Sequence, residues 1–341
     1  MFSKIIGIGG RDFDYDMIKK TCIAAVRIGV PFPFTDKIYG TVSSGYINAK
    51  EQMKKAAANG IKVMGVTPLI GSIRWIREKN CALWQDSWPK SIMGYSYGDS
   101  QFYVLVEEIC KWIAQDLGDL VSGIWQISNE MDTEIFRGPY SLEVAKRVAF
   151  ASAKGIRSVY PDALCGINTA NMKKEAIWMF ENCYTDDSPL NYAGIDGYYS
   201  SWADGRVEDW DDVVARIVEI TGRKVLINEW GYSSIGEVRP AYKDFEEING
   251  ISNICTDKCW FNSWRGETRH TEEIQAEYIL TGLKIFEENE NVIGSFIYSW
   301  RDDVHCFHCG ATDCPAECGW GIIRSDNTPK AAYHKLVEIN G

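Results

Sequence analysis

Short apolar runs alternate along the chain with longer amphipathic segments, and this alternation predicts the fold. Near-continuous apolar runs of four to nine residues are typical of strands buried on both faces of a parallel sheet. Eight such runs occur, at Ile5–Ile8, Ile23–Val30, Ile61–Thr67, Val121–Ser128, Leu164–Asn168, Tyr192–Tyr199, Lys224–Asn228 and Val292–Trp300. Helical patterns lie between them, at Ser100–Leu117, Ser141–Val159, Arg206–Thr221 and Thr271–Glu288. A last helix is predicted over Pro329–Glu338, with Thr328 as its N-cap.

The repeated order of strand and helix predicts an α/β fold, a (β/α)8 TIM barrel. A doubly wound open sheet is the competing architecture, but the opening Gly7–Gly10 does not complete a G-x-G-x-x-G turn because no glycine stands at the third glycine position of that pattern. No linker rich in Pro, Ser or Gly divides the 341 residues. We therefore expect residues 1–341 to form a single catalytic barrel.

The spacing of the predicted strands places an insertion after the seventh of them. The chain from Glu229 to Trp300 is about twice as long as the earlier intervals between strand ends, so extra residues lie around Ser233–His270. Barrel enzymes carry the loops of their active face after the strands. We expect extended loops after strands seven and eight and short connections elsewhere, which leave this face open.

Composition and charge narrow the class of protein. Apolar residues are 45% of the chain and charged residues 24%, which is the balance of a soluble globular protein. The formal charge of -11 and the absence of a basic stripe argue against nucleic acid and anionic membranes as partners. No run reaches the roughly 20 apolar residues that span a bilayer. The start at Met1 has no secretion-signal pattern, so the protein stays inside the cell or has lost a signal. The oligomeric state is not predicted.

Two glutamates at predicted strand ends carry the chemical argument. Glu130 follows the apolar run that ends in Asn129, and Glu229 follows the run that ends in Asn228. Catalytic groups of barrels gather at this end of the strands. An unpaired buried carboxylate is costly, so two of them favour chemistry over a structural role such as a loop cap or an arginine pair. A third Asn-Glu pair, ending at Glu290, lies in a run of charge at a helix end and is expected to be solvated.

Three segments carry a resemblance to a known group of enzymes. Ile124-Trp-Gln-Ile-Ser-Asn-Glu130, Val225-Leu-Ile-Asn-Glu-Trp-Gly231 and Phe296-Ile-Tyr-Ser-Trp300 resemble strands four, seven and eight of the retaining glycoside hydrolases of clan A. This barrel superfamily includes cellulases, mannanases, galactanases and β-galactosidases. The resemblance implies hydrolysis of β-glycosidic bonds with retention, with Glu130 as acid/base and Glu229 as nucleophile. No single family within the clan is assigned.

The same resemblance extends to substrate-binding residues. Arg27 resembles the strand-two arginine that holds the nucleophile ionised, and Tyr198 resembles the strand-six tyrosine that hydrogen-bonds it, although Tyr199 is an alternative. Trp300 resembles the platform beneath the reacting sugar, where clan members often have a cis bond before the tryptophan; core packing is the alternative. Asn129 is expected to donate to the sugar 2-hydroxyl.

Aromatic residues in predicted loops favour a saccharide chain as the partner. Flat aromatic faces pack against sugar rings, and loop packing is the alternative for each of Trp84, Trp88, Trp202, Trp260 and Trp264. Of these we expect Trp202 and Trp264 to contact substrate, with His305 close to it. Polar contacts are expected from Asp86, Asp204 and Arg265. An open face favours cleavage within a polysaccharide over removal of terminal sugars.

A cysteine-rich subregion at 255–318 predicts a structural zinc ion. Cys306, Cys309, Cys314 and Cys318 can wrap a tetrahedral zinc, with disulfides as the alternative, and Cys255 and Cys259 add a further pair. No cofactor is expected for catalysis. A second possibility is a zinc-dependent hydrolase that uses His305 and His308 with Asp302 or Asp303. A third is a sugar-binding barrel without turnover.

Overall fold

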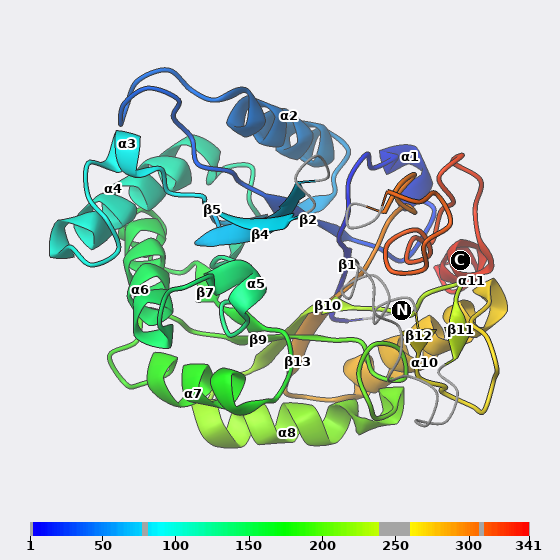
Figure 1. The fold of residues 1–341 in the computed structure, drawn as a ribbon. Coiled ribbons are helices and arrows are strands. Elements are labelled where there is room, and N and C mark those ends of the chain that lie inside the picture. The colour runs from blue at the N-terminus through cyan, green and yellow to red at the C-terminus, as the bar shows by residue number, and fades with distance from the viewer. Residues whose placement is uncertain (1–2, 77–80, 239–259, 307–309, 341) are drawn as a thin grey trace.

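The computed structural model describes residues 3–76, 81–238, 260–306 and 310–340, and Figure 1 traces its fold. Helices lie around the outside of a curved sheet, as Figure 1 shows. No helix in the described part of the chain is long and apolar enough to span a bilayer. The Cys255–Cys259 pair and most of the predicted insertion lie outside the described residues.

The sheet has nine parallel strands and curves into a barrel. Its order is β7-β6-β3-β2-β1-β13-β10-β9-β8, so the first strand pairs with the last, Ile5 opposite Gly294. The two ends of this order, β7 and β8, are separated in sequence only by Ile167, so the chain itself joins them. The strands are β1 Ile5–Ile8, β2 Ala25–Gly29, β3 Lys62–Val66, β6 Ile124–Gln126, β7 Leu164–Gly166, β8 Asn168–Thr169, β9 Ala193–Gly197, β10 Val225–Trp230 and β13 Val292–Ile297. The predicted parallel, barrel-like sheet is confirmed.

The helices agree closely with the sequence pattern where capping residues mark their ends. Ser141 and Thr271 accept hydrogen bonds from the third residue of the helices that they precede. The helices are α1 Tyr15–Ile18, α2 Ser44–Ala58, α3 Lys90–Met93, α4 Ser100–Leu117, α5 Glu134–Arg137, α6 Leu142–Val159, α7 Lys174–Cys183, η2 Val207–Asp209, α8 Trp210–Thr221, α10 Glu272–Glu288 and α11 Ala331–Glu338.

The last helix begins later than its sequence predicts. Lys330, not Thr328, is the N-cap of α11. Pro329 forms a bridge with Ile323, and its carbonyl oxygen accepts a hydrogen bond from Arg324 at 2.8 Å. This local pairing holds Pro329 in an extended conformation, so the proline does not open the helix.

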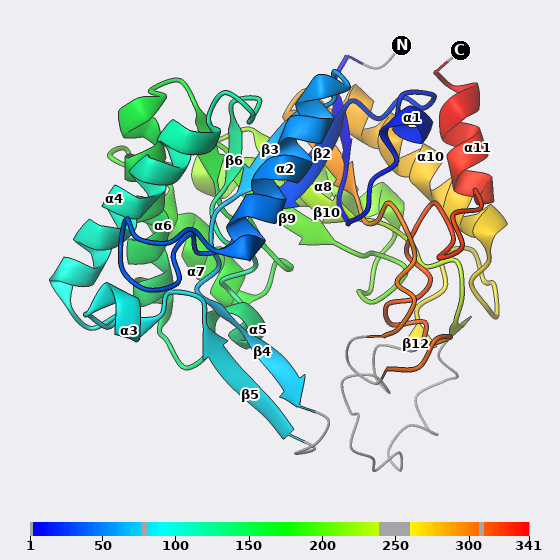
Figure 2. The same ribbon diagram turned by 90° about the horizontal axis from the view of Figure 1, so that it is seen from above.

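Two further strand pairs lie beyond the barrel. β4 (Gly71–Ile76) and β5 (Cys81–Asp86) form an antiparallel hairpin, and β11 (Glu237–Val238) pairs with β12 (Trp260–Phe261). Figure 2 shows the hairpin and β12 extending from the same side of the molecule. The expectation of short connections after the early strands was wrong, because the hairpin follows β3 and rises beside the open end of the barrel.

The barrel interior has an apolar layer at its base. One buried cluster takes one residue from each of five strands around the ring, and a sixth from the position before β9, namely Ala25, Met64, Ile124, Leu226, Phe296 and Tyr192. Gly7 makes room for this layer, since a Cβ there would lie 2.2 Å from the ring of Phe296. A second, larger cluster fills the space between the strands and the surrounding helices.

Candidate active site

Polar side chains form a second layer inside the barrel, above the apolar one. Side chains two positions apart on a strand point to the same face. Arg27 therefore follows Ala25 into the interior, Gln126 follows Ile124, and Asn228 follows Leu226. Gln126 and Asn228 are fully buried and hydrogen-bonded to each other at 2.9 Å. Strand alternation thus builds a polar floor at the carboxyl end of the barrel.

Glu229 lies on this floor with a donor on each carboxylate oxygen. Arg27 forms an ion pair with its Oε1 at 2.8 Å, and the Tyr198 hydroxyl donates to its Oε2 at 2.8 Å. The register of β10 shifts between Ile227 and Glu229, and such irregularities re-aim side chains. Both side chains of the ion pair are largely buried, with 14% exposure for Arg27 and 13% for Glu229.

Arg27 connects Glu229 to the neighbouring strands. Its Nε donates to Gln126 at 2.8 Å and its other terminal nitrogen donates to Asn129 at 2.7 Å. The planar guanidinium presents donors in a fixed fork, so these three contacts define its position. The structure therefore brings together Arg27, Tyr198, Asn129 and Glu229, four residues that are far apart in the sequence.

Glu130 stands in the turn that follows β6. Its φ of 37° and the φ of 59° at Ser128 lie in the left-handed region, which residues other than glycine adopt rarely. The Thr67 hydroxyl accepts from Ser128 N at 2.9 Å, and the Asn168 amide oxygen accepts from Glu130 N at 3.1 Å. Strained backbone that its surroundings hold in place is typical of functional sites.

Asp196 is a third carboxyl group in the same layer, and it was not predicted from the sequence. It lies on β9 opposite Glu229 in register, it is fully buried, and its side chain is hydrogen-bonded to Glu130. Burial, and then the charges of Glu229 and Glu130, raise its pKa well above the ordinary value. An aspartate within the otherwise apolar run Ala193–Gly197 was the signal that could have found it.

Four aromatic rings form a cluster centred on Tyr198, the residue that donates to Glu229. Tyr198 lies at the centre, with ring centroids 5.0 Å from Trp202, 5.0 Å from Trp320 and 6.0 Å from Tyr298. Burial, and second the charge of Glu229, raise the pKa of Tyr198 well above its ordinary value, so the hydroxyl stays protonated as a donor. Trp202 thus lies beside the site, whereas Trp320 and Tyr298 were not identified from the sequence.

Trp300 does not lie at this site, which corrects the expectation of a sugar platform. Its side chain is 1% exposed and packs in the core against Tyr333 of α11. The cis peptide bond joins Tyr298 to Ser299 and does not directly precede the tryptophan. Tyr298, two residues earlier, takes the position next to Tyr198 instead.

Trp264 is also a packing residue in this structure. It is 4% exposed, its ring lies against Tyr278, and its indole nitrogen donates to Glu208. The loop around it is organised by Glu267, which accepts hydrogen bonds from Tyr232, Ser263, Trp264 and Arg265. Trp264 therefore supports this loop from within. His305 is exposed.

A cleft of about 640 Å³ opens above Glu229, Arg27 and Asn129. Its walls are mostly apolar beyond these residues, with Phe32, Phe34, Leu69 and Phe136 among them. The hairpin contributes Gln85 and Asp86, and Asp86 accepts hydrogen bonds from Trp84 and Tyr140, both at 2.8 Å. Trp88, another candidate platform, is 1% exposed and packs in the core.

The predicted zinc ligands are placed only in part. Cys306, Cys314 and Cys318 belong to one small buried cluster, and Cys309 lies outside the described residues. Among the described residues, no group of three or more metal-binding side chains is placed to hold an ion. Burial, and then the neighbouring cysteines, raise the pKa of Cys318 to about 12. The zinc ion stays a prediction.

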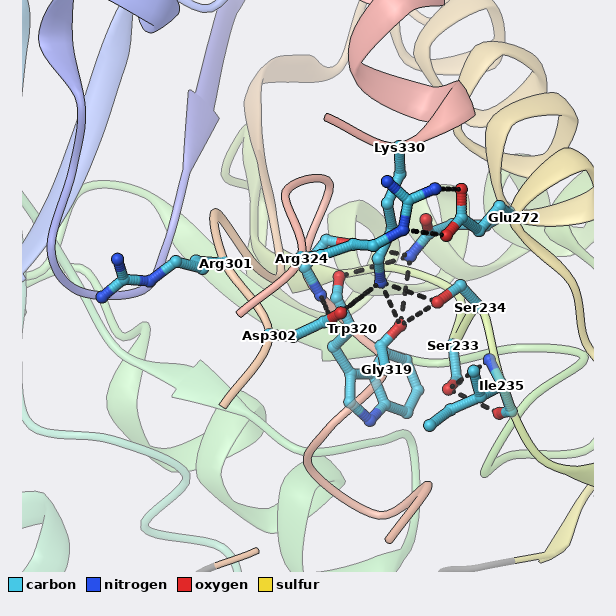
Figure 3. Close-up of polar contacts among 12 residues, drawn as sticks. Ser233, Ser234, Ile235, Glu272, Arg301, Asp302, Gly319, Trp320, Arg324 and Lys330 are labelled. Carbon is cyan, nitrogen blue, oxygen red and sulfur yellow. Dashed lines mark hydrogen bonds and ion pairs between the residues drawn. The ribbon is translucent and has the colours of Figure 1, made fainter. Parts of the chain in front are cut away.

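The acids of the alternative metal site are paired with cations. Lys330 is 2% exposed and forms an ion pair with Asp302 at 2.7 Å, and Arg11 pairs with Asp303 at 2.9 Å. Figure 3 shows Lys330 pointing between Asp302, Ser234 and Gly319, with Arg324 and Glu272 paired beside it. Burial raises the pKa of Asp302 to about 6, against the effect of Lys330. These contacts tie the loops after β10 and β13 to the last helix.

Solved structures with similar folds are glycosidases. A β-glucuronidase from an uncultured Clostridium species aligns with a TM-score of 0.59 and 17% identity over 98% of this chain and 50% of its own. A glucosidase from Croceicoccus marinus aligns with a TM-score of 0.64 and 12% identity over 98% of this chain and 66% of its own. A β-galacturonidase from Eisenbergiella tayi aligns with a TM-score of 0.57 and 17% identity over 98% of this chain and 50% of its own.

This chain therefore shares its barrel fold with known glycosidases. The chain spans about half the length of the two uronidases and about two thirds of the glucosidase. No protein-family model matches the sequence, and no curated protein matches it either.

Proposed function

We propose that the protein is a retaining glycoside hydrolase that cleaves β-glycosidic bonds in an oligosaccharide or polysaccharide. The observation that carries this proposal is Glu229 at the base of an open cleft, with Arg27 on one carboxylate oxygen and Tyr198 on the other. A cation on one oxygen and a neutral donor on the other hold the carboxyl group of a nucleophile in a fixed orientation. The glycosidase barrels of similar fold support the same reading.

Glu229 attacks the anomeric carbon while Glu130 protonates the departing oxygen, which leaves a covalent glycosyl ester on Glu229. Glu130 then takes a proton from water, and the water oxygen displaces Glu229 from the anomeric carbon. Asp196 connects the two glutamates, because it faces Glu229 in register and is hydrogen-bonded to Glu130.

Asn129 is oriented to recognise the sugar. Its amide oxygen accepts hydrogen bonds from Arg27 at 2.7 Å, Asn168 at 3.0 Å and Gln126 at 3.1 Å. These three donors fix which end of the amide faces the protein, so the amino group is the end available to the cleft that Asn129 lines. It donates to the sugar 2-hydroxyl, a contact that strengthens in the transition state.

We infer that β7 and β8 are two halves of one strand, which gives the ring the eight positions of a (β/α)8 barrel. The cleft continues from Glu229 to Gln85 and Asp86 of the hairpin, so it extends well beyond the reacting centre. This extension supports cleavage within a saccharide chain. Products longer than one sugar are the expected result, and release of single sugars alone would assign exo action.

The experiment begins with a screen of substrates. Purified protein is incubated with β-mannan, β-glucan, β-galactan, xylan and a panel of aryl β-glycosides that includes the glucuronide, galacturonide and glucoside, and the products are sized. A fluorinated glycoside of the preferred sugar should then label Glu229, as mass spectrometry of peptides shows.

Two variants separate the roles of the glutamates. With an activated aryl glycoside and azide, Glu130→Ala should yield the β-glycosyl azide, and Glu229→Ala should yield the α-glycosyl azide, because azide then replaces the base-activated water or the nucleophile. Glu272→Gln, a carboxylate that pairs with Arg324 away from the cleft, is the matched control and should keep full activity. Full activity in Glu229→Ala, or ligand binding with no product in the unsubstituted protein, would refute the proposal.

A further inference from the structure

Asp196 is completely buried, and its two carboxyl oxygens have different surroundings. Oδ2 accepts a hydrogen bond from Asn168 Nδ2 at 2.6 Å. Oδ1 receives no hydrogen bond from any donor in the described part of the chain. A buried anion with one unsatisfied oxygen is costly, whereas a neutral carboxyl group carries its proton on that oxygen.

The orientation of Asn168 identifies which oxygen of Asp196 is the acceptor. The amide oxygen of Asn168 accepts from Glu130 N at 3.1 Å and from Gln126 Nε2 at 2.9 Å. Its nitrogen must therefore be the end that faces Asp196, and it donates to Oδ2. This leaves Oδ1 as the site of the Asp196 proton.

The charged and titratable groups that face Asp196 also disfavour its ionised form. They are Glu229 on β10, Glu130 after β6, Arg27 on β2, and Tyr192 and Tyr198 on its own segment, while the neighbouring β8 contributes the neutral Asn168. Two carboxyl groups oppose one arginine, and Arg27 is already paired with Glu229. Glu130 is hydrogen-bonded to the Asp196 side chain, and between two carboxyl groups such a bond requires that one of them carries the proton.

We propose that Asp196 is a positioning residue that stays protonated and donates its hydroxyl hydrogen bond to the carboxyl group of Glu130. This inference rests on the proposed function of Glu130. The Asp196 proton stays on Asp196 in both steps. Glu130 gives its own proton to the departing oxygen, and the Asp196 hydroxyl then stabilises the Glu130 carboxylate that this transfer creates.

The test compares two variants on two kinds of leaving group. Asp196→Asn keeps both hydrogen bonds: the amide oxygen accepts from Asn168, and the neutral amide NH2 donates to Glu130. Asp196→Ala removes the donor. Glycosides with an alkyl or sugar leaving group need the proton of Glu130, whereas a 2,4-dinitrophenyl group departs without one, and kcat/KM reports only the steps up to this departure.

Asp196→Ala should lower kcat/KM for the alkyl glycoside by about tenfold to a hundredfold, the range for one lost hydrogen bond to a charged group. For the dinitrophenyl glycoside the loss should stay below about threefold, because no carboxylate forms on Glu130. Asp196→Asn should restore the alkyl-glycoside rate to within about threefold of the unsubstituted protein. Asp132→Asn, another buried aspartate that instead accepts from Ala170 N, is the matched control and should change neither rate.

Equal losses on both substrates in Asp196→Ala would reduce Asp196 to a packing residue and overturn the inference. A loss of more than tenfold in Asp196→Asn would show that the ionised form is required, and this result decides the question even where Asp196→Ala does not fold. Glu130→Ala tells the two proposals apart. If kcat/KM of Glu130→Ala falls equally for both glycosides, or for neither, the proposed function fails. If kcat/KM falls only for the alkyl glycoside, the role of Glu130 stands, and an unexpected result in the Asp196 variants counts against the role of Asp196 alone.

Discussion

Arg27→Lys should inactivate the enzyme although it preserves the charge beside Glu229. The guanidinium makes three contacts at 2.7 to 2.8 Å, with Glu229, Gln126 and Asn129. A lysine ammonium is a single point donor on a flexible stem and cannot reproduce this fork. Two hydrogen bonds from a charged donor are therefore lost, at about 1.5 kcal/mol each as a lower figure. The site is largely buried, so water compensates little.

A loss of about 3 kcal/mol corresponds to a decrease of about a hundredfold or more in kcat/KM. The assay is hydrolysis of the preferred aryl β-glycoside, with the rate of labelling by the fluorinated glycoside as a second measure of Glu229 reactivity. Arg324→Lys is the matched control, because Arg324 contacts Glu272 with two nitrogens, at 2.8 and 2.7 Å, away from the cleft. It should keep full activity. Unchanged kcat/KM in Arg27→Lys would refute the reasoning from geometry and leave charge alone as the role of Arg27.

Three other predictions concern the nucleophile, a loop and the cysteines. Tyr198→Phe removes one donor from Glu229 and should lower kcat/KM about tenfold or more, whereas Tyr192→Phe, whose hydroxyl donates to the Trp125 carbonyl, should affect only stability. Although burial raises the pKa of Glu267, hydrogen bonds led by that of the Tyr232 hydroxyl hold it at about 2, below the ordinary 4.5. The ionised Glu267 thus contributes its full stabilisation of the folded state above pH 4.5, and this contribution is lost as the pH falls toward 2. Glu267→Gln should cost about 1 to 2 kcal/mol in urea unfolding at pH 7, allowing for solvent screening, and less at pH 3; an equal cost at both would contradict this. Metal analysis should find about one zinc per chain, and a metal-free protein with intact disulfides would exclude a zinc site at Cys306, Cys309, Cys314 and Cys318.

The barrel-like sheet was predictable from the sequence, and the family resemblance added Arg27, Asn129 and Tyr198, which the structure brings together with Glu229 at the carboxyl end of the strands. Apolar runs have a physical cause that acts locally, because a strand buried on both faces must be apolar along its length. Glu130 and Glu229 were visible as the first charged residues after such runs. Arg27 and Tyr198 were found only through the resemblance, because nothing local distinguishes them from residues in ordinary ion pairs or core packing.

The remaining features depend on contacts between distant segments. Trp300 and Tyr298 belong to the same short segment, and only the path of the chain after β13 decides which ring lies beside Tyr198 and which packs against Tyr333. The late start of α11 depends on the pairing of Pro329 with Ile323, which no helix pattern records. Asp196 was missed because a buried aspartate is stable only when hydrogen-bonding partners surround it. Its partners come from two other strands, so the local sequence does not reveal them.

The buried contact between Lys330 and Asp302 has a consequence for how the protein inactivates. Ser234 and Asp302 lie in the loops just beyond Glu229 and Tyr298, and the lysine that joins them precedes the last helix. Detachment of α11 would uncover this ammonium and release both loops while most strands stay paired. On warming, we therefore expect turnover to cease in step with hydrogen exchange of α11, before the central strands exchange their amide protons.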